Sequence, residues 1–382
     1  SYRIPMSAQF DYTTNARSFA FRFPLLTRII IQINYWCLAY IILVTVMYFN
    51  SMSLNYSYNL DLPLRYSPNL WAAIILGATY GTLLGLLDWR TEQVIRKNYP
   101  LGLIIVVSTV IYGLILGAML WFLRYIIWDQ VLAVYFYHPE DFNINDTSWN
   151  YILSMVGIYS LALAPGISFI NQMNKKFGHG VLIPLLMGKY RQPQEENRLF
   201  MFMDLKSSTT HAENLGHLKY SAMIRDCFMD INRVLIRYQG EIYQYVGDEI
   251  VVNWLMIKRF NPVQSVDFFF AVKQRFQSRK EHYHSKYGFL PEFKAGIHSG
   301  IVTAVEVGEI KRDIAYHGDT INTAARIQQV CNQYQQSLLI SGETISKTGD
   351  QHTYDFFPIG ELALRGKLKP TKIFGVQIRN DE

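Results

Sequence analysis

The sequence predicts a two-part protein, an α-helical membrane domain with four spans followed by an α/β domain of the ferredoxin-like, split-βαβ type. Before residue 171 the chain holds four apolar segments, each about 20 residues long and almost without charge. After residue 197, short strand-like runs alternate with helical patterns. The predicted domains are an N-terminal tail at 1–28, a membrane domain at 29–170, a connector at 171–197 and the α/β domain at 198–382.

The four apolar segments have the length that a helix needs to cross about 30 Å of hydrocarbon. They comprise Ile29–Phe49, Asn69–Leu87, Leu101–Phe122 and Tyr151–Ile170. One such segment could be a buried core helix, but four in succession favour a membrane domain surrounded by lipid. None holds an acidic or basic side chain well inside its length. A transporter usually needs such groups at depth, so a transporter is disfavoured.

The distribution of Lys and Arg predicts the orientation of the chain in the membrane. Basic residues gather in the N-terminal tail, between the second and third segments, and after the fourth, whereas the other two loops hold only Arg65 and Arg124. Loops rich in Lys and Arg stay on the cytoplasmic side. We therefore expect a multi-pass protein of the plasma (inner) membrane, with both termini and the α/β domain in the cytoplasm.

Charge and cysteine usage exclude several classes of protein. The formal net charge is +6, but no dense basic run is present, so nucleic acid is not expected as a partner. Cys37, Cys227 and Cys331 lie far apart and form neither a CxxC pair nor a zinc spacing. No disulfide framework is therefore expected, which fits a reducing compartment.

The elements of the α/β domain follow from apolar alternation and periodicity. A short apolar strand is expected at 198–205, and a helix broken near Gly216 follows at 207–240. The segment 240–254 reads as a β-hairpin with Gly247 and Asp248 at its bend. The remaining elements are a helix at 261–287, a strand, a turn and a second strand within 293–308, a helix at 319–332, and strands at 337–342, 353–362 and 371–379.

The first strand ends in a carboxylate that is followed by a polar loop. Asp204 comes directly after apolar residues, and Lys206, Ser207, Ser208 and Thr209 follow it. Ser or Thr there can cap the next helix, whose free N–H groups suit a phosphate. The structural explanation is an ordinary helix cap.

Two further features lie at the hairpin bend and on the later helix. Asp248 follows Gly247 at the bend, where an Asp is usually a turn residue. Asn322 and Arg326 are four residues apart and share one helix face, which is usually a solvated face. Together with Asp204, they indicate phosphoryl chemistry. Two carboxylates at adjacent strand ends can hold two divalent cations against a triphosphate, and an arginine can stabilise charge at the transferred phosphorus.

At this point the sequence resembles the class III nucleotidyl cyclases. The matching pieces are FMFMDLKSST, GEIYQYVGDEIV, GIHSGIVTAVEVG, YHGDTINTAARI and LRGKLKPTKIFGV, which occur in the family's order across 198–382. The connector, with VLIPLLMGKY, resembles membrane-anchored bacterial members. The resemblance implies a homodimer that converts a nucleoside triphosphate into a 3′,5′-cyclic nucleotide and pyrophosphate.

The resemblance also implies roles for individual residues. Asp204 and Asp248 of one chain would bind two Mg²⁺ or Mn²⁺ ions. The partner chain would supply Asn322, which orients the ribose, and Arg326, which binds the phosphates in the transition state. Arg365 stands where the family has a lysine that contacts the terminal phosphates.

The base-reading positions depart from the family pattern. Gln244 stands where adenylyl cyclases usually have a lysine, and Ala315 stands where they have an aspartate or threonine. Guanylyl cyclases tend to use Glu and Cys there, and this chain has neither. Gln can donate and accept hydrogen bonds, so it could meet either purine. ATP is the favoured substrate because most bacterial membrane-bound members of the family are adenylyl cyclases. GTP as substrate, or activity on both purine nucleotides, stays open.

Two other functions stay open. A diguanylate cyclase has a Gly-Gly-Asp/Glu-Glu-Phe hairpin, which VGDEI resembles only superficially, and the NTAAR helix has no place in it. A membrane receptor or scaffold with a degenerate cyclase domain would explain the altered residues Gln244 and Ala315. The presence of Asp204, Asp248, Asn322 and Arg326 counts against that alternative.

Overall fold

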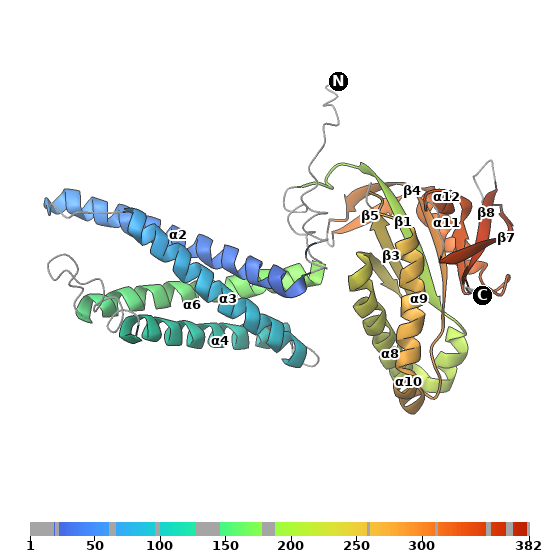
Figure 1. Ribbon diagram of the computed structural model, residues 1–382, viewed down its shortest axis with the longest axis horizontal. Helices are drawn as coiled ribbons and strands as arrows, with labels where there is room; N and C mark the ends of the chain where they lie inside the picture. Colours follow the sequence, from blue (N-terminus) through green and yellow to red (C-terminus); the bar gives the residue numbers. More distant parts are fainter. Residues whose placement is uncertain are drawn as a thin grey trace, which may run out of the picture. The chain divides into compact units, whose positions relative to one another are not determined.

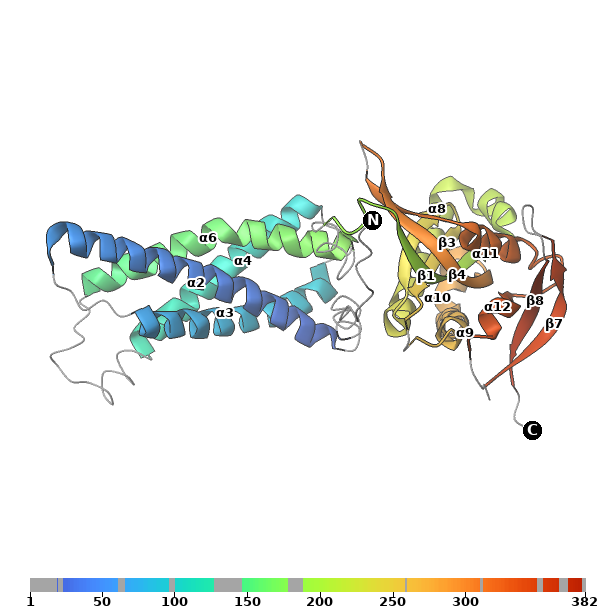
Figure 2. The ribbon, with the colours of Figure 1, turned by 90° about the horizontal axis from the view of Figure 1, so that it is seen from above.

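The computed structural model divides into two compact units, Ser1–Ile183 and Pro184–Glu382, which are described separately (Figures 1 and 2). The boundary lies within the segment interpreted above as a connector. The structure describes Phe19 and residues 23–60, 66–95, 100–126, 146–177, 188–257, 260–309, 312–348, 353–363 and 370–379. Most of the N-terminal tail, much of the connector and Arg365 lie outside the described residues.

Within the described residues, the first unit contains four long helices, all of them long and apolar enough to cross a membrane. These are α2 (Pro24–Tyr58), α3 (Tyr66–Ile95), α4 (Leu101–Phe122) and α6 (Asp146–Phe177). The prediction of four spans is therefore confirmed, although α2, α3 and α6 are longer than the apolar segments from which they were predicted. Large apolar side chains such as Leu114 and Ile158 are about 70% exposed, as lipid-facing residues are.

Helices α2 and α3 pack closely because three glycines of α3 face α2. A Cβ atom on Gly81 would lie 2.6 Å from the Cα of Ile33, and one on Gly77 would lie 2.7 Å from the Cα of Cys37. Gly85 lies similarly close to Ile29. Glycines spaced by four residues let two membrane helices approach backbone to backbone.

A buried polar network joins α2, α3 and α4. The Nε2 of Gln32 donates to Asp88 Oδ2 at 2.7 Å and to Tyr112 Oη at 3.2 Å. The Tyr112 hydroxyl donates to Asp88 Oδ1 at 2.8 Å. Asp88 is one residue past the apolar segment expected for the second span. Because α3 continues to Ile95, Asp88 lies on this helix and contacts α2 and α4.

The second unit is built on an eight-stranded sheet of order β2-β3-β1-β4-β6-β8-β7, with β5 paired to β4. β1 is antiparallel to β3 and β4, and β4 is parallel to β6. The strands are β1 (Gln194–Leu205), β2 (Glu241–Val246), β3 (Glu249–Leu255), β4 (Phe293–Val307), β5 (Asp313–His317), β6 (Leu338–Ser341), β7 (Tyr354–Leu362) and β8 (Thr371–Ile378). The helices are α8 (Ser208–Leu235), the short 3₁₀ turn η2 (Ile236–Tyr238), α9 (Val263–Ser278), α10 (Lys280–Tyr287), α11 (Asp319–Gln329) and α12 (Gly342–Ile345).

Alternation along β1 assigns its side chains to two different layers. Met201 and Met203 are buried in the core that α8 and α9 form over one face of the sheet. Phe200 and Phe202 are buried on the opposite face, with residues of β5 and α11. Because successive side chains of a strand point to opposite faces, Asp204 lies on the α11 face.

The expectation of a turn within 293–308 is wrong, because β4 runs unbroken from Phe293 to Val307. Gly300 lies within this strand and lets α11 pack closely against it. A Cβ atom there would lie 2.5 Å from Thr320 Oγ1 on α11. The helix expected at 261–287 is two helices, which meet at Arg279.

Candidate active site

Asp204 lies near the end of β1, opposite Glu249 of β3 and Lys294 of β4. The Lys294 Nζ is 3.3 Å from Asp204 Oδ2. The Nε2 of Gln328 on α11 donates to the same oxygen at 3.1 Å. The carboxylate therefore lies between two strands and a helix, with one polar contact from β4 and one from α11.

Asp248 lies at the bend between β2 and β3, next to Asp204. Gly247 has φ of +60°, a left-handed conformation that glycine adopts at little cost. Oδ2 of Asp248 is buried, and it has no hydrogen-bond partner among the described residues. A buried carboxylate oxygen without a partner is unfavourable unless a cation or donor completes it. The position therefore fits a bound cation.

The electrostatics of this cluster also favour a cation. Burial, and next the charge of Asp248, raises the pKa of Asp204 above its ordinary value. Burial, followed by the charges of Asp204 and Asp248, raises the pKa of Glu249 to about 7. Lys294 opposes both shifts but does not cancel them. Negative charge is crowded here, and added positive charge would relieve it.

The metal-ligand set of the site is small. Within the described residues, no group of three or more His, Cys, Asp and Glu side chains is arranged to hold a metal ion. Mg²⁺ is commonly bound by one or two carboxylates together with substrate phosphates. Asp204 and Asp248 fit that arrangement, in which the substrate completes the coordination.

The loop after Asp204 leads directly into α8. Ser207 occupies the N-cap position with φ of +54°, and its side chain makes no capping hydrogen bond. The free N–H groups at the start of α8 are thus left to an anion such as a phosphate. Lys206 is paired with Glu292 at 3.2 Å, and Ser208 and Thr209 open the helix.

Asn322 and Arg326 are exposed on α11, as their spacing predicts. Gln328 is buried on the same helix and faces Asp204. Arg326 is two residues before Gln328, about 200° around the helix, and so points to the opposite side. No hydrogen bond joins Asn322 or Arg326 to Asp204 in the part of the chain that the structure describes.

The base-reading candidates lie on β2 and β5. Gln244 is exposed and follows a β-bulge after Ile242, and Ala315 is opposite Val305 on β4. The rings of their neighbours Tyr243 and Tyr316 are 5.1 Å apart, so the two strands approach each other. Arg365 is not among the described residues.

Sequence reasoning missed Lys294, Gln328 and the position of Glu249 beside Asp204. Lys294 and Gln328 reach Asp204 through strand pairing and helix packing between distant segments. The place of Glu249 near the carboxylates could have been inferred from the sequence, because Glu249 directly follows Asp248 and begins a strand.

Comparison with known proteins identifies the family of the second unit. Residues 190–377 match the family model described as the adenylate and guanylate cyclase catalytic domain. Adenylate cyclase 2 of Rhizobium meliloti (strain 1021) is 30% identical over 210 residues, which cover 55% of this chain and 58% of the relative. Adenylate cyclase 1 of the same organism is 26% identical over 181 residues, which cover 46% of this chain and 27% of the relative.

The similarity does not extend over the whole length of these relatives. The chain spans 58% of the first relative and 27% of the second. Among solved structures, a bacterial light-regulated adenylyl cyclase matches 56% of this chain and 63% of its own, with a TM-score of 0.48 and 18% identity. The family match covers nearly all of the second unit, Pro184–Glu382. The second unit is therefore a catalytic domain of the class III nucleotidyl cyclases, the adenylate and guanylate cyclase family.

Proposed function

We propose that this protein is a membrane-bound adenylate cyclase that converts ATP into 3′,5′-cyclic AMP and pyrophosphate. The observation that carries this function is the carboxylate pair of Asp204 and Asp248, with one buried oxygen lacking a hydrogen-bond partner. The start of α8, whose N–H groups could bind a phosphate, follows the first of these carboxylates closely in the sequence.

The reaction joins the ribose 3′-oxygen to the α-phosphorus and breaks the bond from that phosphorus to the bridging oxygen of the β-phosphate. The hydroxyl proton is released, and pyrophosphate leaves. Two divalent cations, when bound, supply charge neutralisation and make the 3′-hydroxyl a better nucleophile. Asp204 and Asp248 would hold these Mg²⁺ or Mn²⁺ ions.

The remaining site residues bind and orient the nucleotide. The N–H groups at the start of α8, with Lys206, Ser207, Ser208 and Thr209 around them, would bind phosphate oxygens. Arg365 would contact the terminal phosphates.

Asn322 and Arg326 would act on the site of a partner chain. In one chain they are exposed on α11, whereas Gln328 of the same helix faces Asp204. A two-fold dimer brings the same surfaces of two chains together, so each chain would supply Asn322 and Arg326 to the carboxylates of the other. Asn322 would orient the ribose, and Arg326 would stabilise the charge that develops on the phosphates.

The choice of ATP is supported by the relatives, which are named adenylate cyclases. In this proposal, Gln244 and Ala315 would meet the base. Because Ala315 has no polar side-chain group, one contact to the base must come from backbone or water. Guanylate cyclase or dual-purine activity is the second candidate, and the missing contact at Ala315 is the observation that favours it.

The placement in the membrane follows from the helices and the charges. The four apolar helices would lie in the plasma (inner) membrane, surrounded by lipid. The Lys and Arg distribution would place both termini and the catalytic unit in the cytoplasm.

The direct test uses the purified full chain in lipid nanodiscs with Mn²⁺ or Mg²⁺. ATP and GTP are supplied in parallel, and products are separated by chromatography. We expect cyclic AMP and pyrophosphate in equal amounts, with less cyclic GMP. Cyclic GMP as the main product would favour the second candidate. If neither nucleotide were cyclised, the degenerate receptor or scaffold would be the better description.

A further inference from the structure

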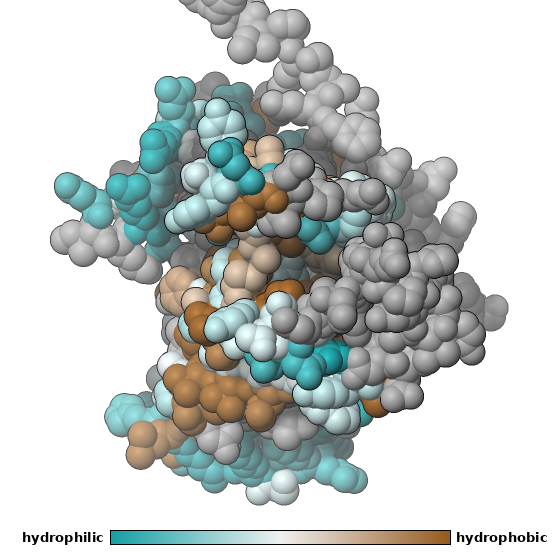
Figure 3. Space-filling view, turned by 90° about the vertical axis from the view of Figure 1, so that its left-hand side faces the viewer, coloured by the Kyte–Doolittle hydropathy of each residue, from teal (hydrophilic) through white to brown (hydrophobic). Residues whose placement is uncertain are grey.

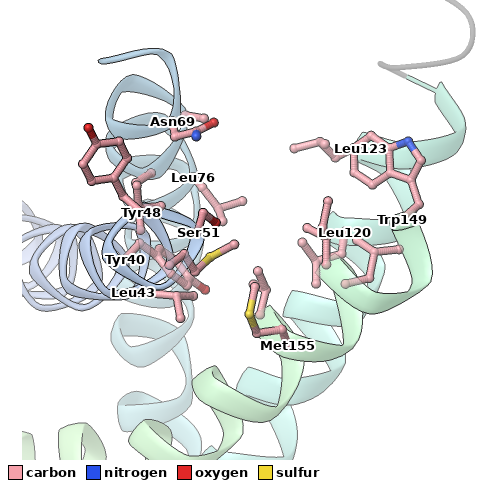
Figure 4. Close-up of a pocket in the computed structure, with 17 residues that line it drawn as sticks. Tyr40, Leu43, Tyr48, Ser51, Asn69, Leu76, Leu120, Leu123, Trp149 and Met155 are labelled. Atoms are coloured by element: carbon pink, nitrogen blue, oxygen red, sulfur yellow. The ribbon is translucent and has the colours of Figure 1, made fainter. Parts of the chain in front are cut away.

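A cavity of about 390 Å³ lies inside the four-helix unit, at the end where α2 and α4 finish and α3 and α6 begin (Figure 4). Its volume is within the range of about 300–1,000 Å³ that small-molecule sites occupy. All four helices contribute to its wall, which includes Leu43, Met47, Leu76, Leu120, Trp149 and Met155. In Figure 4, residues of α2 and α3 face residues of α4 and α6 across the open space.

The chemistry of the wall selects an uncharged occupant. Among the residues that the structure describes, no Asp, Glu, Lys, Arg or His side chain lines the cavity. A charged ligand would lose its hydration there without gaining a partner, which is strongly unfavourable. The polar side chains on the wall are neutral, and Ser51 of α2 and Asn69 of α3 supply a hydroxyl and an amide that can bind a polar head group.

The cavity is closed toward the middle of the bundle by packed side chains. The Tyr40 hydroxyl and the Ser160 hydroxyl are 3.0 Å apart, joining α2 to α6. The rings of Trp36 and Tyr80 lie 4.6 Å apart, and both residues are almost fully buried. The open space is therefore confined to one end of the bundle. Figure 3 faces that end and shows hydrophobic residues at its surface among polar ones.

We propose that this cavity binds an uncharged amphiphile, with a compact apolar body and a hydroxyl or carbonyl head. The apolar body would fill the space between α2, α4 and α6, and the head would bond with Ser51 and Asn69. An empty apolar cavity of this size would cost stability, because its lining atoms lack contact partners. Either a small solute or a neutral membrane lipid offers this chemistry.

The test is photolabelling of the full chain in phosphatidylcholine nanodiscs. The probe is an aryl trifluoromethyl diazirine that carries a benzyl alcohol, and labelled residues are mapped by mass spectrometry. We expect saturable labelling of Met47 and Met155, reduced by excess n-decanol at least about fivefold. Decanoate and decyltrimethylammonium should reduce it far less. If dioleoylglycerol in the nanodisc also reduces the labelling, the site binds a neutral lipid. If dioleoylglycerol does not reduce the labelling while decanol does, the site binds a small solute.

Two valines of α2 provide a matched pair of variants. Val44 lines the cavity, whereas Val46 is 61% exposed and is not part of the lining. Val44→Trp should fill the space and abolish the competed labelling, and Val46→Trp should leave it unchanged. Met155→Trp fills the space from α6 and gives a second variant if Val44→Trp does not fold.

Several results would overturn the proposal that this cavity binds an uncharged amphiphile. These are labelling that decanol does not reduce, equal competition by the charged compounds, or competed labelling that survives in folded Val44→Trp or Met155→Trp protein. The readout is binding in the membrane unit, so it stays informative whether or not the chain cyclises ATP.

Discussion

Gln328 of α11 donates a hydrogen bond of 3.1 Å to Asp204 of the same chain. This contact fixes the orientation of the helix, because one face of α11 is committed to its own carboxylate site. The exposed face, with Asn322 and Arg326, is left for another molecule. The pairing of Gln328 with Asp204 is thus the strongest support within one chain for a site shared between two chains.

Complementation between two inactive variants tests the shared site. Asp204→Ala and Arg326→Ala should each abolish cyclic nucleotide formation, because each removes an essential group from both sites of a homodimer. Mixing and re-equilibrating the two should restore activity to about a quarter of the wild-type level, since half the dimers would be mixed and each would hold one intact site.

The control is a chain that carries both substitutions. Mixed with either single variant, it cannot complete any site and should restore nothing. If the two single variants form mixed dimers, shown by a pull-down with two tags, and yet remain inactive, the shared-site arrangement is wrong.

Changing the base-reading positions should sharpen nucleotide selectivity. Gln244→Lys combined with Ala315→Asp restores the residue types that adenylyl cyclases usually have there. Regaining a polar contact to the base should raise the ATP to GTP ratio of kcat/KM about tenfold. Gln377→Lys adds the same charge at an exposed position on β8 and should not change the ratio. An unchanged ratio in the double variant would mean that other groups read the base.

Gly296 of β4 should be essential for the position of α11. A Cβ atom there would overlap the backbone N of Gln328 and lie 2.7 Å from its Cα. Gly296→Ala should push the helix away, lower the free energy of unfolding by about 1–3 kcal/mol and reduce kcat. Gly360→Ala is the matched control, because the nearest atom to its Cβ would be 3.6 Å away. Equal melting temperatures and rates for both variants would contradict this role.

The sequence predicted the parts of the site that depend on local pattern. Asp204 was expected at the end of a buried strand, Asp248 at a hairpin bend, and Asn322 with Arg326 on one helix face. Each follows from a short-range rule, such as alternation along a strand or spacing on a helix. The roles of these residues remain predictions, whereas their positions are now described.

The sequence could not predict contacts that depend on distant segments meeting. Lys294 and Gln328 reach Asp204 only after β4 pairs with β1 and α11 packs over both strands. The turn expected within 293–308 is replaced by one unbroken strand, in which Gly300 makes a close contact with α11. The membrane cavity was also inaccessible to sequence reasoning, since it arises from four helices together.

Asp230 should make stability depend on pH. Burial alone would raise the pKa of this carboxyl, but hydrogen bonds from Tyr283, Arg279 and Arg275 outweigh burial and lower the pKa below its ordinary value. A lowered pKa means that the stabilising contribution is present above the unfolded value of about 3.9 and is lost as the pH falls below it.

The measurement compares the wild type with Asp230→Asn by thermal unfolding of the full chain. At pH 7 the variant should lose about 3 kcal/mol, because the partly exposed Arg275 and Arg279 would lose the buried counter-charge that they contact. The difference should shrink below about pH 4, where the carboxyl of the unfolded wild-type chain takes up a proton before that of the folded chain does. Glu281→Gln removes a carboxylate at an exposed position on α10, and its effect should be small at every pH. A constant difference between pH 7 and pH 3 would contradict the assigned titration.

The glycines of α3 should control the packing of the membrane unit. Their spacing of four residues was visible in the sequence, and the structure gives it a partner in α2. Gly81→Leu would place its side chain against the backbone of Ile33, where no space exists, and should destabilise the unit by about 1–3 kcal/mol or more. Gly117→Leu on α4 is the matched control, because no atom lies within 4 Å of its Cβ position. Thermal unfolding of the full chain in nanodiscs should show a lower melting temperature for Gly81→Leu alone. If both variants have the same melting temperature as the wild type, the close approach of α2 and α3 does not stabilise the unit.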